Sequence, residues 1–95
     1  MKIQLHDDKR ENSFGSGWWR SVTITKDDGA GREIETVFRV GVYSDGKPRK
    51  IAYRGGARGF WWYADVMSEG RLVWTGRVSK SIGVRGILKA AEIIE

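Results

Sequence analysis

Apolar and polar side chains alternate over several stretches of the chain, which is the spacing of half-buried β-strands. The stretches are also rich in Trp, Val, Ile, Tyr and Thr, the residue types that strands favour. We predict strands at 2–6, 18–26, 32–43, 49–54, 60–67 and 71–78. The connections between them contain Asp, Gly, Ser and Pro, which suit turns. Strands joined by such short turns indicate an antiparallel sheet.

The hydrophobic period changes near the end of the chain. Apolar residues recur there at helical spacing: Val84, Ile87, Leu88, Ala91 and Ile94. This stripe predicts one amphipathic helix. Ser81 or Ser79 would serve as its N-cap, because a serine hydroxyl can accept a hydrogen bond from a first-turn N–H group.

These elements predict an α+β fold. It consists of an antiparallel sheet of five to six strands, strongly curled or barrel-like, with one C-terminal helix packed on one face. All 95 residues form one domain, because two halves of this size would each be too small to bury a core. The predicted parts are an edge strand with a polar loop over 1–15, the sheet over 16–78 and the helix over 81–95.

The alternation divides the predicted sheet into two faces. One face is apolar and is expected to lie under the helix: Trp18, Val22, Ile24, Ile34, Phe38, Val40, Val42, Phe60, Trp62, Ala64, Val66, Leu72, Trp74 and Val78. The other face combines aromatic rings with arginines: Trp19, Arg39, Tyr43, Trp61, Tyr63, Arg71 and Arg77. It also carries several hydroxyl side chains.

Positive charge is concentrated in one part of the chain. The 17 Lys and Arg residues exceed the 12 Asp and Glu residues, so the net charge is +5. No acid occurs between Asp45 and Asp65, whereas five basic residues do: Lys47, Arg49, Lys50, Arg54 and Arg58. Residues 53–60 are similar to one copy of an RGG segment, although a hairpin connection with solvated arginines accounts for them more simply. Such a density of cations suits contacts to phosphates.

The mixed face and the basic stretch together predict a surface for single-stranded DNA or RNA. Ring faces stack on bases, at roughly 1–3 kcal/mol each, while arginines neutralise phosphates. The predicted binding residues are Trp19, Arg39, Tyr43, Lys47, Arg49, Lys50, Arg54, Arg58, Trp61, Tyr63, Arg71 and Arg77.

Two other interpretations of the mixed face stay open. Trp, Tyr and Arg are also the residues that protein interfaces favour. The chain would then be a protein-binding inhibitor or adaptor, for example a phage or mobile-element protein that docks this face on a host protein. A less favoured interpretation is that the face forms the interior of a small barrel.

The sequence favours binding over catalysis. It contains no cysteine, so thiolate nucleophiles and cysteine metal sites are excluded. With His6 as the one histidine, a zinc site would require an all-carboxylate ligand set. Neither a phosphate-binding P-loop nor a serine nucleophile elbow occurs. We therefore predict no enzyme activity, no metal and no cofactor. A nuclease that uses scattered acids and a divalent metal is the alternative.

Assembly and location complete the predictions. The apolar arc of the predicted helix is widened by four further residues: Gly83, Gly86, Ala90 and Ile93. The arc is then wider than one sheet would cover. A homodimer would cover the rest, unless the N-terminal segment folds over it. The first residues lead into charge rather than an apolar run, and no stretch approaches the ~18 apolar residues of a membrane span. We therefore expect a cytoplasmic protein with no membrane contact.

Overall fold

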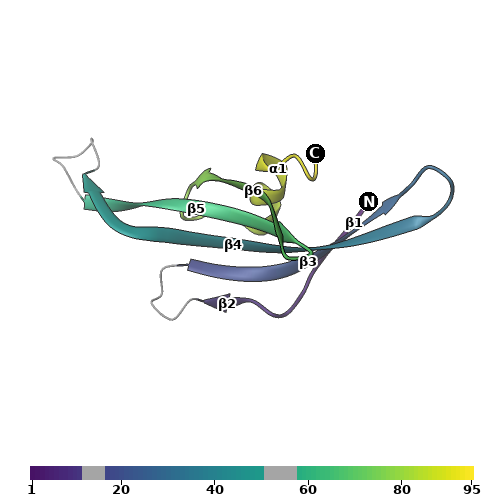
Figure 1. Cartoon of the computed structure of the whole chain (residues 1–95), viewed down its shortest axis with the longest axis horizontal. Helices are drawn as coiled ribbons and strands as arrows, with labels where there is room; N and C mark the ends of the chain where they lie inside the picture. The colour runs from purple at the N-terminus through teal and green to yellow at the C-terminus, as the bar shows by residue number, and fades with distance from the viewer. Residues whose placement is uncertain (12–16, 51–57) are drawn as a thin grey trace.

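The chain forms an elongated sheet with one helix on one of its faces (Figure 1). The computed structural model describes residues 1–11, 17–50 and 58–95, and for residues 48–50 and 58 it describes the backbone only. Its extents are 57 × 26 × 21 Å. The described elements are β1 (Lys2–Leu5), β2 (Arg10–Glu11), β3 (Gly17–Asp27), β4 (Glu33–Lys50), β5 (Arg58–Ser68), β6 (Arg71–Val78) and α1 (Val84–Ala90).

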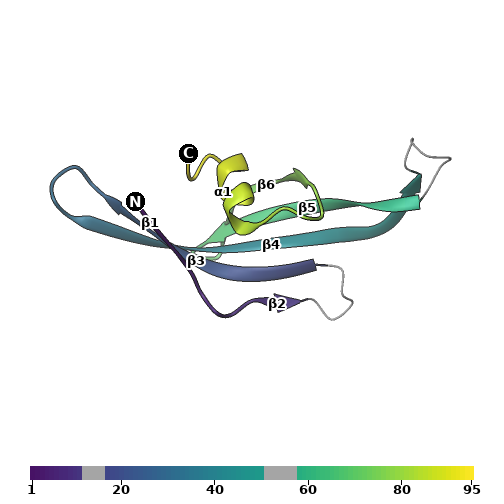
Figure 2. The same ribbon diagram turned by 180° about the vertical axis from the view of Figure 1, so that it is seen from behind.

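All strand pairs are antiparallel, and the strand order is β1-β3-β4-β5-β6. The short β2 pairs with the same edge of β3 as β1, next to Trp18 and Trp19. Seen from behind, α1 and the segment before it lie over the middle of the sheet (Figure 2). The predicted antiparallel sheet with one C-terminal helix is confirmed.

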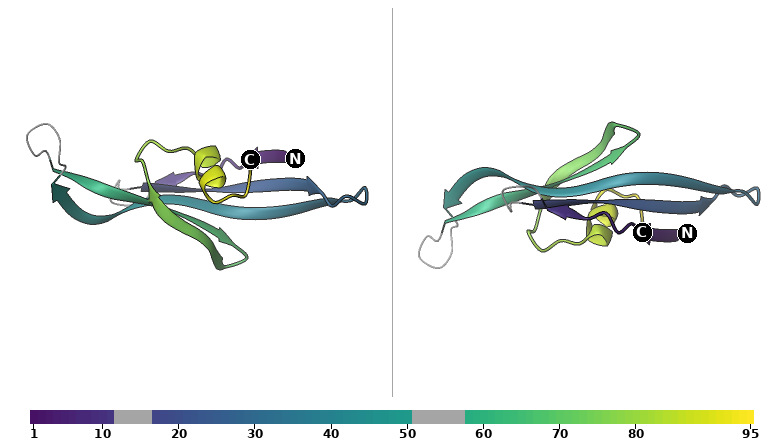
Figure 3. Two further views of the ribbon diagram at one scale, coloured as in Figure 1. Left: turned by 90° about the horizontal axis from the view of Figure 1, so that it is seen from above. Right: turned by 90° about the horizontal axis from the view of Figure 1, so that it is seen from below.

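The sheet is open, so the predicted barrel-like closure is not confirmed. Among the described residues, β1 and β2 form one edge, β6 forms the other, and the two edges do not pair. The hairpin of β5 and β6 turns away from the long β3–β4 hairpin, as views from above and below show (Figure 3). Strand twist therefore separates the edges instead of bringing them together.

The core lies between the sheet and α1, as the alternation predicts. Its buried side chains are Val22, Ile24, Val40, Val42, Ala64, Val66, Val84, Ile87, Leu88 and Ile94. Each fully buried aliphatic side chain contributes roughly 1.5–3 kcal/mol. Three residues assigned to this face are nevertheless exposed: Ile34, Phe60 and Leu72. A helix of seven residues is only about 10 Å long, so it covers the centre of the sheet and leaves Ile34 and Phe60 uncovered nearer its ends. Leu72 was assigned to the wrong face, because a register shift between Val66 and Met67 pairs Leu72 with Met67 on the side opposite α1.

The turn predicted at 44–48 is wrong, because β4 continues through it. Ser44 pairs with Trp62 and Pro48 pairs with Phe60, so three β4 residues face one residue of β5. The turn chemistry is present: the Ser44 hydroxyl accepts from Gly46 N–H at 3.2 Å, and Gly46 has φ of +73°. These contacts form an irregular bulge within the strand instead of ending it. The strand predicted at 49–54 starts as the end of β4, and residues 51–54 lie outside the described residues.

The helix is shorter than predicted at both ends. Ser79 and Ser81 bond to each other in a turn, with the two hydroxyl oxygens 3.1 Å apart, so Gly83 becomes the N-cap without a side-chain bond. At the other end, Glu92 has φ of +58°, and Ile93 N–H donates to Leu88 C=O at 2.9 Å. This is a Schellman-type ending. The chain reverses there and the side chain of Ile94 returns to the core.

Candidate functional site

The face of the sheet opposite α1, named the open face below, brings several of the predicted binding residues together. In the strand register, Tyr43 of β4 lies opposite Tyr63 of β5, and Tyr63 lies opposite Arg77 of β6. Trp19 of β3 lies opposite Gly41, next to Arg39. Because side chains alternate along each strand, all of these point away from the helix.

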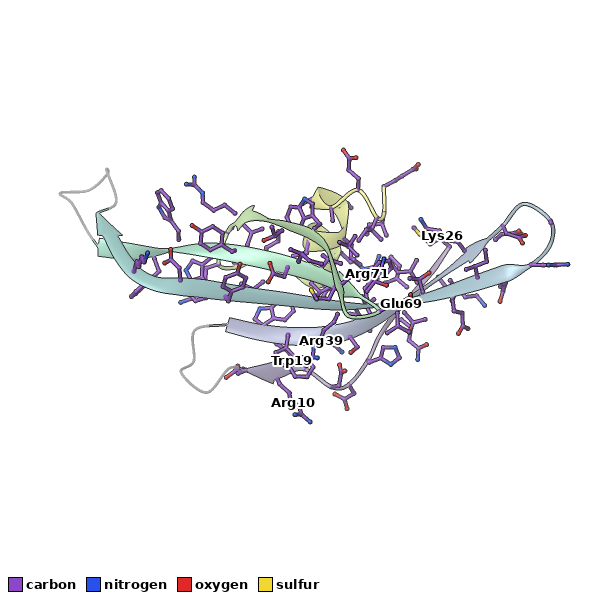
Figure 4. All side chains as sticks on the ribbon, viewed as in Figure 1. Arg10, Trp19, Lys26, Arg39, Glu69 and Arg71 are labelled. Atoms are coloured by element: carbon purple, nitrogen blue, oxygen red, sulfur yellow. The ribbon has the colours of Figure 1, made fainter. Side chains whose placement is uncertain are left out.

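Trp19 is flanked by two arginines from neighbouring strands. The guanidinium carbon of Arg39 lies 3.4 Å from the centre of the Trp19 ring, and that of Arg10 lies 5.5 Å from it. Figure 4 labels these three side chains, which come from β2, β3 and β4 and lie together. We call them the Trp19 cluster. The contacts are cation–π interactions, which orient the guanidinium groups before any ligand arrives.

Arg10 is a binding candidate that the sequence prediction missed. It was assigned to a polar loop, whereas the structure pairs it with Trp19 in the two-residue strand β2. A strand this short has no period to detect. The available signal was the run of charge just before a Trp-rich strand.

Further along the open face, three rings and an arginine form a second group, the Trp61 cluster: Tyr43, Trp61, Tyr63 and Arg77. The rings of Tyr43 and Tyr63 are stacked, with centroids 5.7 Å apart and planes inclined by 26°. The guanidinium carbon of Arg77 lies 4.7 Å from the centre of the Trp61 ring. Trp61 is 44% exposed, which is high for a side chain of its size.

A shallow depression of about 330 Å³ connects the two clusters. Its lining includes Trp19, Arg39, Tyr43 and Asp65. Gly41 also lines it, and since glycine has no side chain, the space opposite Trp19 stays open. The Tyr43 hydroxyl donates to Asp65 Oδ1 at 3.4 Å, which sets a hydrogen-bond acceptor beside the rings.

The remaining predicted residues lie away from these clusters or outside the described part of the chain. Lys47 is exposed on the β4 bulge, and Arg71 is exposed beside the β5–β6 turn, close to Glu69 (Figure 4). For Arg49, Lys50 and Arg58 the backbone alone is described, and it places Lys50 directly opposite Arg58. Arg54 and most of the RGG-like run lie outside the described residues.

Acidic residues gather at the opposite end of the molecule, around the turn between β3 and β4. Asp27, Asp28, Glu33 and Glu35 are all exposed there, beside Lys26 and Arg32. The basic stretch of β4 and β5 lies at the other end of the long axis (Figure 1). Charge is therefore distributed unevenly along the long axis of the molecule.

The N-terminal segment is tied to the edge of β3 by polar contacts. His6 Nε2 lies 2.5 Å from Thr23 Oγ1, and Ser21 N–H donates to Asp8 Oδ1 at 3.0 Å. Hydrogen bonds from the hydroxyl and the backbone N–H of Ser21 lower the pKa of the Asp8 carboxyl below its ordinary value of 3.8. His6 thus has a position at the sheet edge with a structural partner.

The described residues contain no group of three or more His, Cys, Asp or Glu side chains that could hold a metal ion. In the same part of the chain, none of the helical segments has the length and apolarity to cross a membrane. Comparisons with protein-family models, with curated proteins and with solved structures found no match. The function therefore has to be inferred from the residues themselves.

Proposed function

We propose that this chain is a nucleic-acid-binding protein that holds single-stranded DNA or RNA on its open face. The observation that supports this most is the repeated pairing of an aromatic ring with an arginine. Arg39 lies against Trp19, and Arg77 lies against Trp61. Both pairs lie on one sheet face, with the stacked Tyr43 and Tyr63 rings between the tryptophans.

The two kinds of side chain have separate roles in this proposal. Rings such as Trp61 and Tyr63 stack on unpaired bases, each contributing roughly 1–3 kcal/mol. Arginines such as Arg39 neutralise phosphates or stack on bases themselves. The depression near Gly41 has a volume at the lower end of the range for small-ligand pockets, so it suits a single base. Asp65 offers an acceptor to a base amino group there.

A single strand fits this face better than a duplex. In a double helix the bases are stacked on one another, and only their edges are reachable from the grooves. Flat rings such as Trp61 and Tyr63 would then have no base face to contact. The described open face is also a sheet with no helix on it that could enter a major groove.

Charge suggests which part of the open face the strand occupies. The acidic turn around 27–35 repels phosphates, whereas the ends of β4 and β5 carry Lys47 and the basic residues after it. The nucleic acid would therefore run across β2 to β6 and avoid the far end of the β3–β4 hairpin.

This function is tested by titrating the protein with a labelled single strand of about 12 nucleotides over a range of salt concentrations. The open face carries three arginines in its two clusters: Arg10, Arg39 and Arg77. If each contacts one phosphate, the slope of log K against log salt should be near −2, at about −0.7 per contact. Binding should also quench tryptophan fluorescence. Binding that does not weaken with salt, or no binding at low salt, would contradict the proposal.

A protein partner is the second candidate function, favoured by one observation. The open face is apolar at its other end, where Val37 is 57% exposed and Leu72 is 55% exposed, with Met67 near them. Exposed aliphatic groups of this kind mark protein contacts. If the chain is such an inhibitor or adaptor, oligonucleotides will leave its fluorescence unchanged at physiological salt.

The homodimer stays a prediction from the sequence. The structure shows that this chain itself covers part of the wide apolar arc of α1, because a Cβ at Gly86 would lie 2.9 Å from Ile82 Cγ1. Ile93 also packs against the core cluster. Size-exclusion chromatography with light scattering would decide whether a second copy covers the rest.

A further inference from the structure

A second concave site lies on the helix side of the sheet, away from the open face. It is a pocket of about 530 Å³ between the N-terminal half of β3, the segment after β1 and the start of α1. Four basic residues from separate parts of the chain line it: Lys9, Arg20, Lys80 and Arg85. Within the described part of the chain, none of its lining residues is acidic.

Two of the cations are held in place by contacts within the protein. Arg20 Nε donates to the backbone oxygen of His6 at 2.6 Å. That bond uses one of the five N–H donors of the guanidinium group, so the others can serve a ligand. Lys9 Nζ lies 5.2 Å from the centre of the Trp18 ring, which also lines the pocket.

Like Lys9, Lys80 lies against a tryptophan ring. Its ammonium group lies 5.3 Å from the centre of the Trp62 ring. Trp18 and Trp62 both pack against the core cluster, and this packing restrains the two rings that the lysines contact. All four cations line one hollow, and like charges that lie near one another repel.

We propose that this pocket binds a phosphate ester. A dianionic phosphate removes the repulsion among the four cations, and its oxygens match the forked donors of Arg20 and Arg85. The apolar side chains of Leu5 and Trp18 line the same pocket and can contact the group that carries the phosphate. The volume lies within the range of small-molecule sites.

The source of the phosphate ester is either a free mononucleotide or the terminal phosphate of a nucleic-acid strand. Both present the same phosphomonoester group. The proposal does not depend on strand binding at the open face, because the two sites lie on opposite sides of the sheet and share only the Trp18 residue among their linings.

The test is calorimetric titration with adenosine 5′-monophosphate, adenosine, and one oligonucleotide with either a 5′-phosphate or a 5′-hydroxyl, all at one ionic strength. The probes are compared on the wild type, on Lys80→Glu/Arg85→Glu and on Arg32→Glu. Arg32 is an exposed arginine at the far hairpin turn, so it controls for the loss of positive charge. Lys80→Gln and Arg85→Gln, changed singly at exposed positions, replace the double variant if that protein does not fold.

We expect a phosphate-bearing probe to bind the wild type at least about tenfold more tightly than its phosphate-free counterpart, because charge-assisted bonds are strong. The double variant should lose that difference and Arg32→Glu should keep it. Tighter binding of adenosine 5′-monophosphate than of adenosine would identify a small ligand. A phosphate-dependent difference in the oligonucleotide pair alone would identify the end of a nucleic-acid strand as the ligand. Equal binding with and without phosphate, or unchanged binding by the double variant, would overturn the proposal. Open-face variants such as Trp61→Ala should leave the phosphate-dependent difference intact, which separates the two proposals.

Discussion

The guanidinium carbon of Arg39 lies 3.4 Å from the centre of the Trp19 ring, although the two residues are not directly paired in the ladder. Trp19 lies opposite Gly41, whereas Arg39 lies opposite Ser21, one step along the same face. The contact is therefore diagonal between two strands. It holds a flexible side chain in one conformation before a ligand binds, which reduces the entropy lost on binding.

If Arg39 contacts a phosphate, Arg39→Gln will weaken single-strand binding and flatten its salt dependence. One lost phosphate contact makes the slope of log K against log salt less negative by about 0.7. Arg32→Gln removes the same charge at the far hairpin turn and should leave the slope unchanged. Fluorescence titrations at several salt concentrations measure both slopes, and equal slopes for the two variants would rule out this role for Arg39.

Gly41→Val tests whether the depression between the clusters accepts a base. A Cβ at Gly41 would lie 3.4 Å from its nearest neighbours, so the backbone tolerates a side chain, but the valine methyl groups would occupy the depression. We expect affinity for a single strand to fall at least several-fold. Stability should rise or stay the same, because glycine inside a strand costs roughly 0.5–1 kcal/mol relative to alanine. Unchanged affinity in a folded Gly41→Val protein would show that the depression is not used.

The two faces of the sheet could be predicted from the sequence because strand alternation has a strict period of two. Val22, Val40 and Val66 are buried as predicted, while Tyr43 and Tyr63 lie together on the other face. Each assignment required only neighbouring residues.

The parts that could not be predicted depend on contacts between distant segments. Ser44 and Gly46 carry turn signals, but whether the chain turns or bulges there depends on how far β5 pairs with β4. The position of Arg10 beside Trp19 likewise arises from a two-residue pairing with no local pattern. The pocket around Arg20 joins segments more than 60 residues apart in the sequence, from Leu5 to Arg85.

Asp8 gives a pH-dependent contribution to stability. Its pKa is lowered in the folded protein, so the ionised carboxylate stabilises the fold above the ordinary pKa of 3.8. That contribution is lost as the pH falls below 3.8 and through the lower folded value. Asp8→Asn should therefore destabilise the protein at neutral pH, and the difference from the wild type should shrink in acid. Urea unfolding at pH 7 and around pH 2 measures it, with Asp7→Asn as a control for charge. A difference that persists unchanged in acid would contradict this.

Glu92 ends the helix in a conformation that suits glycine. Its φ is +58°, and the bonds of the Schellman-type ending are formed around it. Since a side chain in this region is disfavoured, Glu92→Gly should raise the free energy of unfolding by about 0.5–1 kcal/mol. Thermal unfolding measures the change. Glu95→Gly, at an exposed position beyond that ending, should have no effect, and equal effects of the two substitutions would refute the argument.

The most direct test of strand binding on the open face compares two neighbouring residues of β5. Trp61 and Phe60 are both exposed, at 44% and 49%, but they point to opposite faces of the sheet. The measurement is the equilibrium affinity of a single strand of about 12 nucleotides for the wild type, Trp61→Ala/Tyr63→Ala and Phe60→Ala. We predict that the double variant loses at least about tenfold in affinity, since two stacking contacts disappear, while Phe60→Ala binds like the wild type. Equal affinities for all three folded proteins would contradict the assignment of nucleic-acid binding to this face.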